Sequence, residues 1–290
     1  MKFHILAIPL AVLLFLPGTA SPQGSKIVIQ KAPDWVNPLR FDSDANPPAG
    51  QEEGYYYLLI DEQENAVTQE VYQHYVYKVL TSEGVQGMSD LTFDYDPAYQ
   101  KLILHHVSVH RDGKVINQLP EDIRPIQREQ SMDRYLYDGS LTAVINLKDI
   151  RVNDVIEYAY TRKGYNPVFN GHFSKKIYFN FSLPYEKLFQ RLVVPPSLPL
   201  NFEYRNADAK PLIKDAGGNK EYTWTFNHVN GLILDDNLPD WYDGNQYVMI
   251  TDFANWGDVA AWATNHFETT PGERELLKSK VGSNFVSGDT

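Results

Sequence analysis

The stretch "LILHHVSVHRDGKVINQL", residues 102–119, carries the clearest indication of the fold. Two runs rich in β-branched and apolar residues flank the dipeptide Asp112-Gly113. Asp-Gly suits a two-residue turn whose twist matches that of the flanking strands, and Val and Ile fit the pleated, half-buried surface of a sheet. The stretch therefore predicts two antiparallel strands joined by a tight turn.

Two further stretches alternate between residues of opposite character, as expected for strands that bury one face. The expected inward faces are Ile177, Phe179 and Phe181 in one stretch, and Tyr222, Trp224, Phe226 and His228 in the other. The alternation extends over enough residues to favour strands over helices.

Turn residues separate the apolar runs along most of the chain. Asn153-Asp154, Gly164 to Pro167 and Gly217-Gly218-Asn219 are clusters of this kind. Strands that recur about every ten residues are typical of antiparallel sheets packed face to face. We therefore expect residues 53–250 to form a mainly β domain, a large antiparallel β-sandwich of the immunoglobulin-like class. The polar residues 121–138 are expected to form a short helix or a long loop.

The N-terminus has the pattern of a secretory signal peptide. Lys2 supplies a positive charge, residues 5–16 are apolar, and Gly18-Thr19-Ala20 resembles a cleavage site. A buried N-terminal helix is the alternative. We expect residues 1–20 to be removed and the mature chain to be exported to the periplasm or cell envelope. Residues 21–52 should then form an irregular lead-in, anchored by Trp35 and Val36.

Composition restricts the partners and the chemistry. The formal net charge is −11, which disfavours nucleic acid and anionic lipid surfaces because both require a basic footprint. The chain contains no cysteine, so disulfides, thiolate nucleophiles and cysteine-ligated metals are excluded. After the signal peptide, no segment approaches the ~20 apolar residues of a membrane-spanning helix.

The pattern changes from strand to helix near residue 251. Asn255 is placed to cap a helix, with Asp258 three residues later and Trp256 and Trp262 at helical spacing. Pro271 ends this helix, and a second helical stretch follows over residues 272–282. We therefore expect residues 251–290 to be helical.

The usual catalytic motifs are missing. The sequence has no Gly-x-Ser-x-Gly, no Ser-x-x-Lys, no His-Glu-x-x-His and no glycine-rich phosphate loop. No catalytic or cofactor-binding residue is assigned on this basis, and the chain is expected to be non-catalytic.

The histidines in "HHVSVH" are the best metal candidates. On a regular strand His106 and His110 share a face about 13 Å apart at about 3.3 Å per residue, and His105 points to the other face. One ion with bonds of about 2 Å cannot span that distance without a ligand from a neighbouring strand. Surface exposure or cross-strand pairing is favoured, so no metal ligand is assigned. A metal-dependent hydrolase built on His106 or His110 stays open as a further hypothesis.

The acidic stretch "DLTFDYDPAYQ" contains Asp90, Asp94 and Asp96 and invites comparison with a calcium loop. The glycine and the terminal bidentate glutamate of an EF-hand loop are missing, and three carboxylates are few for six to eight oxygen ligands. Asp96, which precedes Pro97, is better interpreted as a turn former.

Aromatic residues are abundant, with 19 Tyr, 14 Phe and 5 Trp. Exposed Tyr and Trp could form a platform for a glycan or a peptide, because a flat ring offers contact area with little entropy to lose. The alternating stretches instead place most rings in the core or in cross-strand pairs. Tyr55-Tyr56-Tyr57 must place rings on both faces of a strand, so at least one of them is a candidate for exposure.

Four segments occur in a recognisable order. They are "FDYDPAYQKLILHHVSVHRDGKVI" at residues 93–116, the stretch from Ile145 to Tyr204 that contains "DVIEYAYT", "YTWTFNHVNGLILDDNLPDW" at residues 222–241 and "FANWGDVAAWA" at residues 253–263. Over about residues 55–262 the chain resembles an uncharacterised bacterial domain family found N-terminal to transglutaminase-like domains in exported proteins. It departs from that family's pattern at Val152-Asn153, where Pro-Gly is usual.

The resemblance implies a role in support of another domain. In such proteins the tryptophan-containing helix leads into a transglutaminase-like core, so the resemblance implies that residues 251–290 are the helical start of a truncated transglutaminase-like region. No catalytic position of that core can be matched here. We expect a non-catalytic module that supports, or presents substrate to, a transglutaminase-like or cysteine-protease-like domain. The alternative is a stand-alone glycan- or peptide-binding module.

Overall fold

The fold is seen in a computed structural model that describes residues 27–48, 53–127, 139–234, 237–239 and 241–284. The predicted signal peptide over residues 1–20 lies outside the described residues, as does most of the polar segment 121–138. The described part of that segment, residues 121–127, contains no helix, and Ile126 forms an isolated bridge with Thr142.

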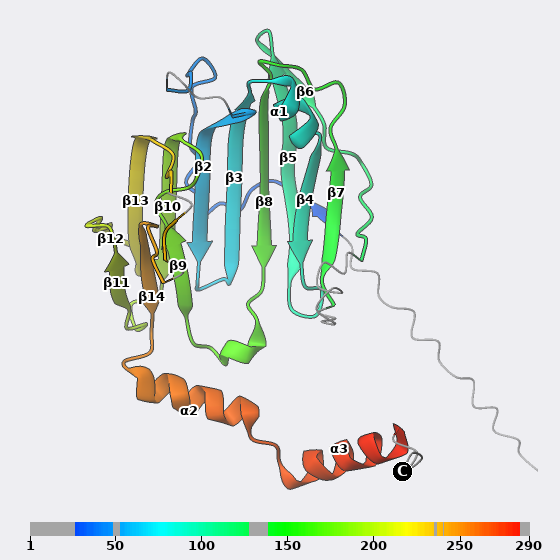
Figure 1. Cartoon of the computed structure of the whole chain (residues 1–290), viewed down its shortest axis with the longest axis vertical. Coiled ribbons are helices and arrows are strands. Elements are labelled where there is room, and N and C mark those ends of the chain that lie inside the picture. The colour runs from blue at the N-terminus through cyan, green and yellow to red at the C-terminus, as the bar shows by residue number, and fades with distance from the viewer. Residues whose placement is uncertain (1–26, 49–52, 128–138, 235–236, 240, 285–290) are drawn as a thin grey trace, which may run out of the picture.

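The largest sheet in the described part of the chain has nine strands and extends across most of the molecule (Figure 1). Its order is β1-β5-β8-β3-β2-β10-β13-β12, with β6 paired to β5. The strands are β1 (Val28–Ile29), β2 (Tyr55–Asn65), β3 (Glu70–Val79), β5 (Lys101–Arg111), β6 (Lys114–Asn117), β8 (Val155–Lys163), β10 (Tyr185–Val194), β12 (Leu212–Ala216) and β13 (Asn219–Val229).

Two small sheets pack on one face of the large sheet. One is β4 (Asp90–Tyr95) with β7 (Leu141–Asn146), and the other has the order β11 (Asn201–Arg205), β14 (Tyr247–Thr251), β9 (Ser174–Tyr178). Phe93 and Ile145 of the first pack against β3, β5 and β8, and Val248 and Ile250 of the second pack against β2, β10 and β13. The chain is therefore mainly β and consists of several sheets in two layers.

The opposite face of the large sheet carries a smaller apolar cluster. Leu59, Val76 and Val155 are buried there, and Leu39 and Phe41 of the N-terminal segment pack against them. The Nε1 atom of Trp35 donates to Glu70 Oε2 at 2.6 Å, and Arg191 Nη1 donates to the carbonyl oxygen of Trp35 at 2.7 Å. The irregular segment before β2 thus covers part of this face.

The expectation of purely antiparallel sheets is wrong at two places. β1 pairs with β5 in parallel, and β10 pairs with β2 in parallel. Parallel neighbours require a crossover connection. For β10 this connection includes β9, which belongs to the second layer, so the chain leaves the large sheet after β8 and returns beside β2.

The predicted turns and inward faces are mostly confirmed. Asp112 and Gly113 form the β5–β6 turn with φ values of 51° and 72°, as a type I′ turn requires. Tyr222 and Trp224 are buried on β13 as expected. His228 departs from the expected inward face because its backbone has a φ of 53°, and its side chain is exposed.

Helices are few and short in the described residues. α1 (Ser82–Gly87) and the 3-10 turn η2 (Pro167–Phe169) connect strands, whereas α2 (Trp256–Phe267) and α3 (Pro271–Asn284) lie beyond one end of the sheets (Figure 1). Asn255 caps α2 as predicted, because its side chain accepts from the backbone N–H of Asp258. Among the described residues, no helix combines the length and the apolar character needed to cross a bilayer.

Candidate functional site

A bulge in β5 determines where its histidines point. The pairing of β5 with β8 shifts register between Leu104 and His106, so that an extra residue, His105, is inserted. His105 stacks on Tyr72 and its Nε2 atom lies 2.7 Å from Thr161 Oγ1. His105 therefore lies on the same face as His106, and the expectation that it points to the opposite face is wrong.

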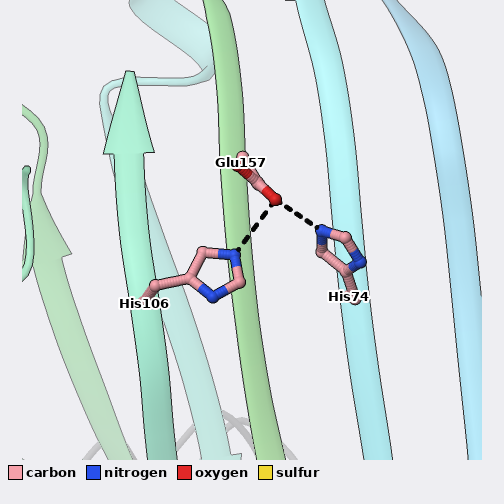
Figure 2. A group of neighbouring side chains, drawn as sticks. All are labelled: His74, His106 and Glu157. Carbon is pink, nitrogen blue, oxygen red and sulfur yellow. Dashed lines mark hydrogen bonds and ion pairs between the residues drawn. The ribbon is translucent and has the colours of Figure 1, made fainter. Parts of the chain in front are cut away.

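Two histidines flank an alanine in one row of the large sheet. Ala159 of β8 pairs with His74 of β3 on one side and with His106 of β5 on the other. Glu157 lies two residues before Ala159 on the same strand and so on the same face. Because Ala159 has a small side chain, the two imidazoles can lean over it, and their ring centroids are 5.5 Å apart. Figure 2 shows both rings directed at the Glu157 carboxylate.

The Glu157 carboxylate uses its two oxygen atoms differently. Oε1 lies 3.0 Å from His74 Nε2 and 3.3 Å from His106 Nε2, and Oε2 lies 2.7 Å from His110 Nε2. Three histidines from two strands thus meet one carboxylate on the strand between them. We refer to His74, His106, His110 and Glu157 as the histidine cluster.

Burial and charge act against each other in the histidine cluster. The side chain of His74 is 6% exposed and that of Glu157 is 16% exposed. Burial by itself raises the pKa of Glu157, but His106 and His74 outweigh it and hold that pKa well below its usual range. Burial lowers the pKa of His74, but Asp61 and Glu157 outweigh it and raise that pKa above the ordinary histidine value. The resulting state is a charged carboxylate that faces imidazoles.

Asp61 lies on the Nδ1 side of the His74 ring. It lies in the same row of the sheet, with its Oδ2 atom 3.8 Å from His74 Nδ1, and Gln63 Nε2 donates to Asp61 Oδ1 at 3.0 Å. Burial raises the pKa of Asp61, and the interactions with His74 and Gln63 offset only part of that increase. The protonated ring that the raised pKa of His74 favours directs its Nδ1–H at Asp61 and donates from Nε2 to Glu157 Oε1.

The Nε2 atom of His106 faces Glu157 without forming a well-aligned hydrogen bond to any described residue. It is buried and, among the described residues, no group pairs with it in hydrogen-bond geometry, although Glu157 Oε1 is within ion-pair distance. The rest of the His106 side chain is 40% exposed. With Glu157 it lines a shallow, open depression of about 340 Å³ whose other walls include Val115 and Asn117. The cluster is therefore reachable from solvent on the His106 side.

Two members of the histidine cluster were missed by the sequence reasoning. His74 and Glu157 come from strands that the spacing within "HHVSVH" does not involve, and they supply the neighbouring-strand ligands that a metal site would need. A weak signal was present, because His74 lies between Tyr72 and Val76 on one face of its strand. The distance of about 13 Å between His106 and His110 along a strand does not prevent both rings from contacting one carboxylate.

The acidic stretch considered for calcium does not converge. Asp94 Oδ1 accepts from Thr142 Oγ1 at 2.5 Å, and Asp90 is at the exposed start of β4. Asp96 Oδ1 accepts from the backbone N–H of Ala98 at 2.9 Å, so the interpretation of Asp96 as a turn former is confirmed.

The other face of the large sheet carries a half-buried carboxylate, Glu62. Its Oε1 atom accepts from the Tyr75 hydroxyl at 2.6 Å and from Gln73 Nε2 at 2.8 Å, and Oε2 accepts from Gln190 Nε2 at 3.4 Å. Burial raises the pKa of Glu62, but Lys175, Tyr75 and Gln73 outweigh it, so the pKa lies below its usual value.

Glu62 borders a cleft rich in tyrosine. The cleft has a volume of about 400 Å³, and its walls include Tyr55, Tyr57, Tyr158 and Tyr160. Tyr158 and Tyr160 are nearly parallel, with an interplanar angle of 14°. The expectation that aromatic residues mostly form the core or cross-strand contacts is compatible with these half-buried rings, which also present edges to the cleft.

A third hollow lies between the second small sheet and α2. It has a volume of about 630 Å³, and its aromatic lining consists of Phe169, Phe202, Phe253, Trp256 and Trp262. Trp262 stacks on Phe169 with an interplanar angle of 6°, and its Nε1 atom donates to the carbonyl oxygen of Val168 at 3.0 Å. We refer to this hollow as the α2 groove.

The model of a domain of unknown function, DUF3857, matches residues 65–232. The chain belongs to the DUF3857 family. The match includes His74, His106, His110 and Glu157, whereas Glu62 and α2 lie outside the matched range. No curated protein matches the chain.

The DUF3857 chain is similar in fold to a solved structure described as "a putative protease from Parabacteroides distasonis". The TM-score is 0.62 and the sequence identity is 14%. The likeness covers 69% of this chain and 41% of that protein. The chain therefore matches about two fifths of the length of that structure, and at this identity the likeness concerns the fold alone.

Proposed function

We propose that this DUF3857 chain is a non-catalytic module that supports, or presents substrate to, a transglutaminase-like or cysteine-protease-like domain. The observation that carries the proposal is the exposed aromatic surface of α2. Trp256 is 84% exposed and Phe267 is 86% exposed, and none of the described residues of α2 is buried. Exposed apolar surface of this kind is typical of a protein interaction site.

The α2 groove gives this surface a recess. Trp262 packs one edge of the helix against Phe169, and the groove beside it is lined by five aromatic rings together with Lys175 and Lys176. Aromatic residues are the usual anchors of protein interfaces because they bury a large area with few rotatable bonds. A partner that inserts an apolar segment here would cover Trp256 as well.

The partner is proposed to be a transglutaminase-like domain for two reasons. The order of segments resembles a family that precedes such domains. The solved structure of similar fold is described as "a putative protease" and extends well beyond the shared part. Consistent with this role, we propose that the two layers form an immunoglobulin-like sandwich, and that residues 1–20 direct export to the periplasm or cell envelope.

Site-specific photo-crosslinking in the producing cell tests this proposal. A photoreactive phenylalanine analogue replaces Trp256 in one sample and Phe267 in another, and the crosslinked peptides are sequenced by mass spectrometry. Ile213, 58% exposed on β12, is the control because it is an exposed apolar residue on a different element. Crosslinks from positions 256 and 267 to a transglutaminase-like domain support the proposal. Crosslinks to proteins of another class, or equal yields from position 213, contradict it.

Activity measurements provide a second test. The purified chain is expected to show no peptidase, amidase or cross-linking activity by itself. Turnover that persists after dialysis against a chelator would overturn the non-catalytic assignment.

The tyrosine-lined cleft favours one alternative, a stand-alone module that binds a peptide or a glycan. Flat rings beside the charged Glu62 suit a basic peptide side chain, because a cation interacts favourably with both aromatic faces and a carboxylate. Titration with lysine-rich and neutral peptides, followed by tryptophan fluorescence, distinguishes the two. Saturable binding that is lost in Tyr57→Ala and Tyr160→Ala supports the alternative.

A further inference from the structure

We propose that His74, His106 and Glu157 bind a Zn²⁺ ion. The ligand atoms are His74 Nε2, His106 Nε2 and Glu157 Oε1, and atoms of these three residues lie within 4.8 Å of one another. Two imidazole nitrogens and one carboxylate oxygen form a donor set that suits zinc, whereas calcium and magnesium prefer oxygen ligands alone.

The spacing of the ligand atoms fits a tetrahedral ion. Zinc bonds to nitrogen and oxygen are about 2.0–2.1 Å long, so two ligands of a tetrahedral zinc are about 3.3 Å apart. Glu157 Oε1 lies 3.0 Å from one histidine nitrogen and 3.3 Å from the other. Two of the three ligand separations therefore match a tetrahedral ion, and the third, between the two histidine residues, lies within 4.8 Å; side-chain rotations would bring the three atoms to bonding distance.

The unsatisfied Nε2 atom of His106 points independently to a ligand. A buried polar atom without a well-aligned hydrogen bond is costly, and among the described residues this nitrogen has only the ion-pair contact with Glu157 Oε1 at 3.3 Å. Coordination to a metal ion would satisfy it. The burial of His106 Nε2 without a well-aligned hydrogen bond is therefore explained if the site holds a cation.

Neighbouring groups hold the three ligands in orientation. His110 Nε2 contacts Glu157 Oε2 at 2.7 Å and so leaves Oε1 for the ion. Asp61 faces the Nδ1 atom of His74, and Gln63 in turn donates to Asp61. A carboxylate behind a histidine ligand is common at zinc sites, where it fixes the tautomer of the ring.

The fourth coordination position is expected to face solvent. Zinc sites with three protein ligands normally bind a water molecule or another small ligand at the fourth position. The depression beside His106, lined in part by Val115 and Asn117, lies on that side. The ion would join β3, β5 and β8, which are neighbours in the centre of the sheet. This inference does not depend on the function proposed for α2.

Zinc titration of the untagged, chelator-treated protein tests the inference. We expect about one ion per chain, measured by competition with a fluorescent zinc indicator and by elemental analysis after gel filtration. Replacement of Zn²⁺ by Co²⁺ should give the visible absorption bands of a tetrahedral site. A wild-type protein that binds no ion overturns the inference.

Three variants and a control locate the site. His106→Gln changes a partly exposed side chain and should weaken zinc affinity more than 100-fold, and Glu157→Gln should also remove the Co²⁺ bands. Asp61→Asn should weaken the affinity about 10- to 100-fold, as expected for a residue that orients a ligand. The control is His228→Gln, because His228 Nδ1 forms an ion pair with Glu186 at 3.1 Å on a different strand and should leave affinity unchanged.

Circular dichroism establishes whether each variant is folded. If Glu157→Gln does not fold because its side chain is more buried, His106→Gln still tests the site. Wild-type affinity in folded His106→Gln would overturn the inference. So would loss of binding in His228→Gln, because the ion would then be bound elsewhere.

Discussion

Glu157 and Glu62 are two carboxylates on opposite faces of the same sheet, and their partners differ in kind. Glu62 accepts hydrogen bonds from a tyrosine hydroxyl and two glutamine amides, which keep their protons at any ordinary pH. Glu157 faces three imidazoles, which can lose a proton or exchange it for a metal ion. The hydrogen bonds of Glu62 therefore stay the same across the ordinary pH range, whereas the contacts of Glu157 can respond to pH and to metals.

The largest expected effect is the loss of stability on removal of either carboxylate. Glu62→Ala leaves fixed donors unsatisfied, and the free energy of unfolding should fall by about 3–5 kcal/mol at both pH 5.5 and pH 8. Glu157→Ala should cost less at pH 8, about 1–3 kcal/mol, because the facing histidines can become neutral. Urea denaturation measures both. An equal loss for the two variants at pH 8 would contradict the comparison.

Two tyrosine variants sharpen the contrast within one strand. Tyr75→Phe removes a hydrogen bond to the charged Glu62 and should lower the free energy of unfolding by about 1.5–3 kcal/mol. Among the described residues the buried hydroxyl of Tyr77 has no hydrogen-bond partner, so Tyr77→Phe should leave stability unchanged or raise it by about 1 kcal/mol. Thermal unfolding of the pair provides the measurement, and destabilisation by Tyr77→Phe would show that its hydroxyl is paired in solution.

A larger residue at position 159 tests whether the gap between His74 and His106 matters. Ala159→Leu should overpack the row and cost about 1–3 kcal/mol, and it should also weaken zinc binding. Ala143→Leu is the matched control, because Ala143 is equally buried but lies on β7. We expect a similar loss of stability there with normal zinc affinity. Zinc binding that survives Ala159→Leu would mean that the two rings do not meet over this residue.

The smallest effect is the pH dependence of the metal-free protein. The pKa of folded His74 is raised above 6.5, so its stabilisation is present below that pH and is lost as pH rises through the folded pKa. The pKa of Glu157 is lowered from 4.5, so its stabilisation is present above that pH and is lost on acidification. The two contributions overlap between about pH 4.5 and 6.5. Unfolding curves should show a decline above this range that His74→Gln reduces and His228→Gln does not.

Local chemistry made part of the fold predictable. The Asp112-Gly113 turn, the buried face of β13 and the Asn255 cap depend on residues that are close in sequence, and each is observed. The face of His105 and the exposure of His228 could not be predicted in the same way. A bulge shifts the face of His105, and a left-handed backbone turns His228 outward, and neither is specified by alternation alone.

The candidate site depended on the pairing of strands. "HHVSVH" drew attention to β5, but His74 and Glu157 join it only because β8 lies between β3 and β5 in the sheet. The importance of Ala159 also depends on strand pairing, because its small side chain matters only where a histidine flanks it on each side.

The sequence by itself determined a mainly β chain, its turns, its terminal helices and the absence of thiol chemistry, because these follow from residue types and short-range spacing. The tertiary structure alone decided which strands are neighbours and on which face of the sheet the bulge places His105. It also decided which carboxylate His74, His106 and His110 contact. Contacts between distant residues depend on strand order and register, and the free energy that selects them comes from packing of the whole sheet.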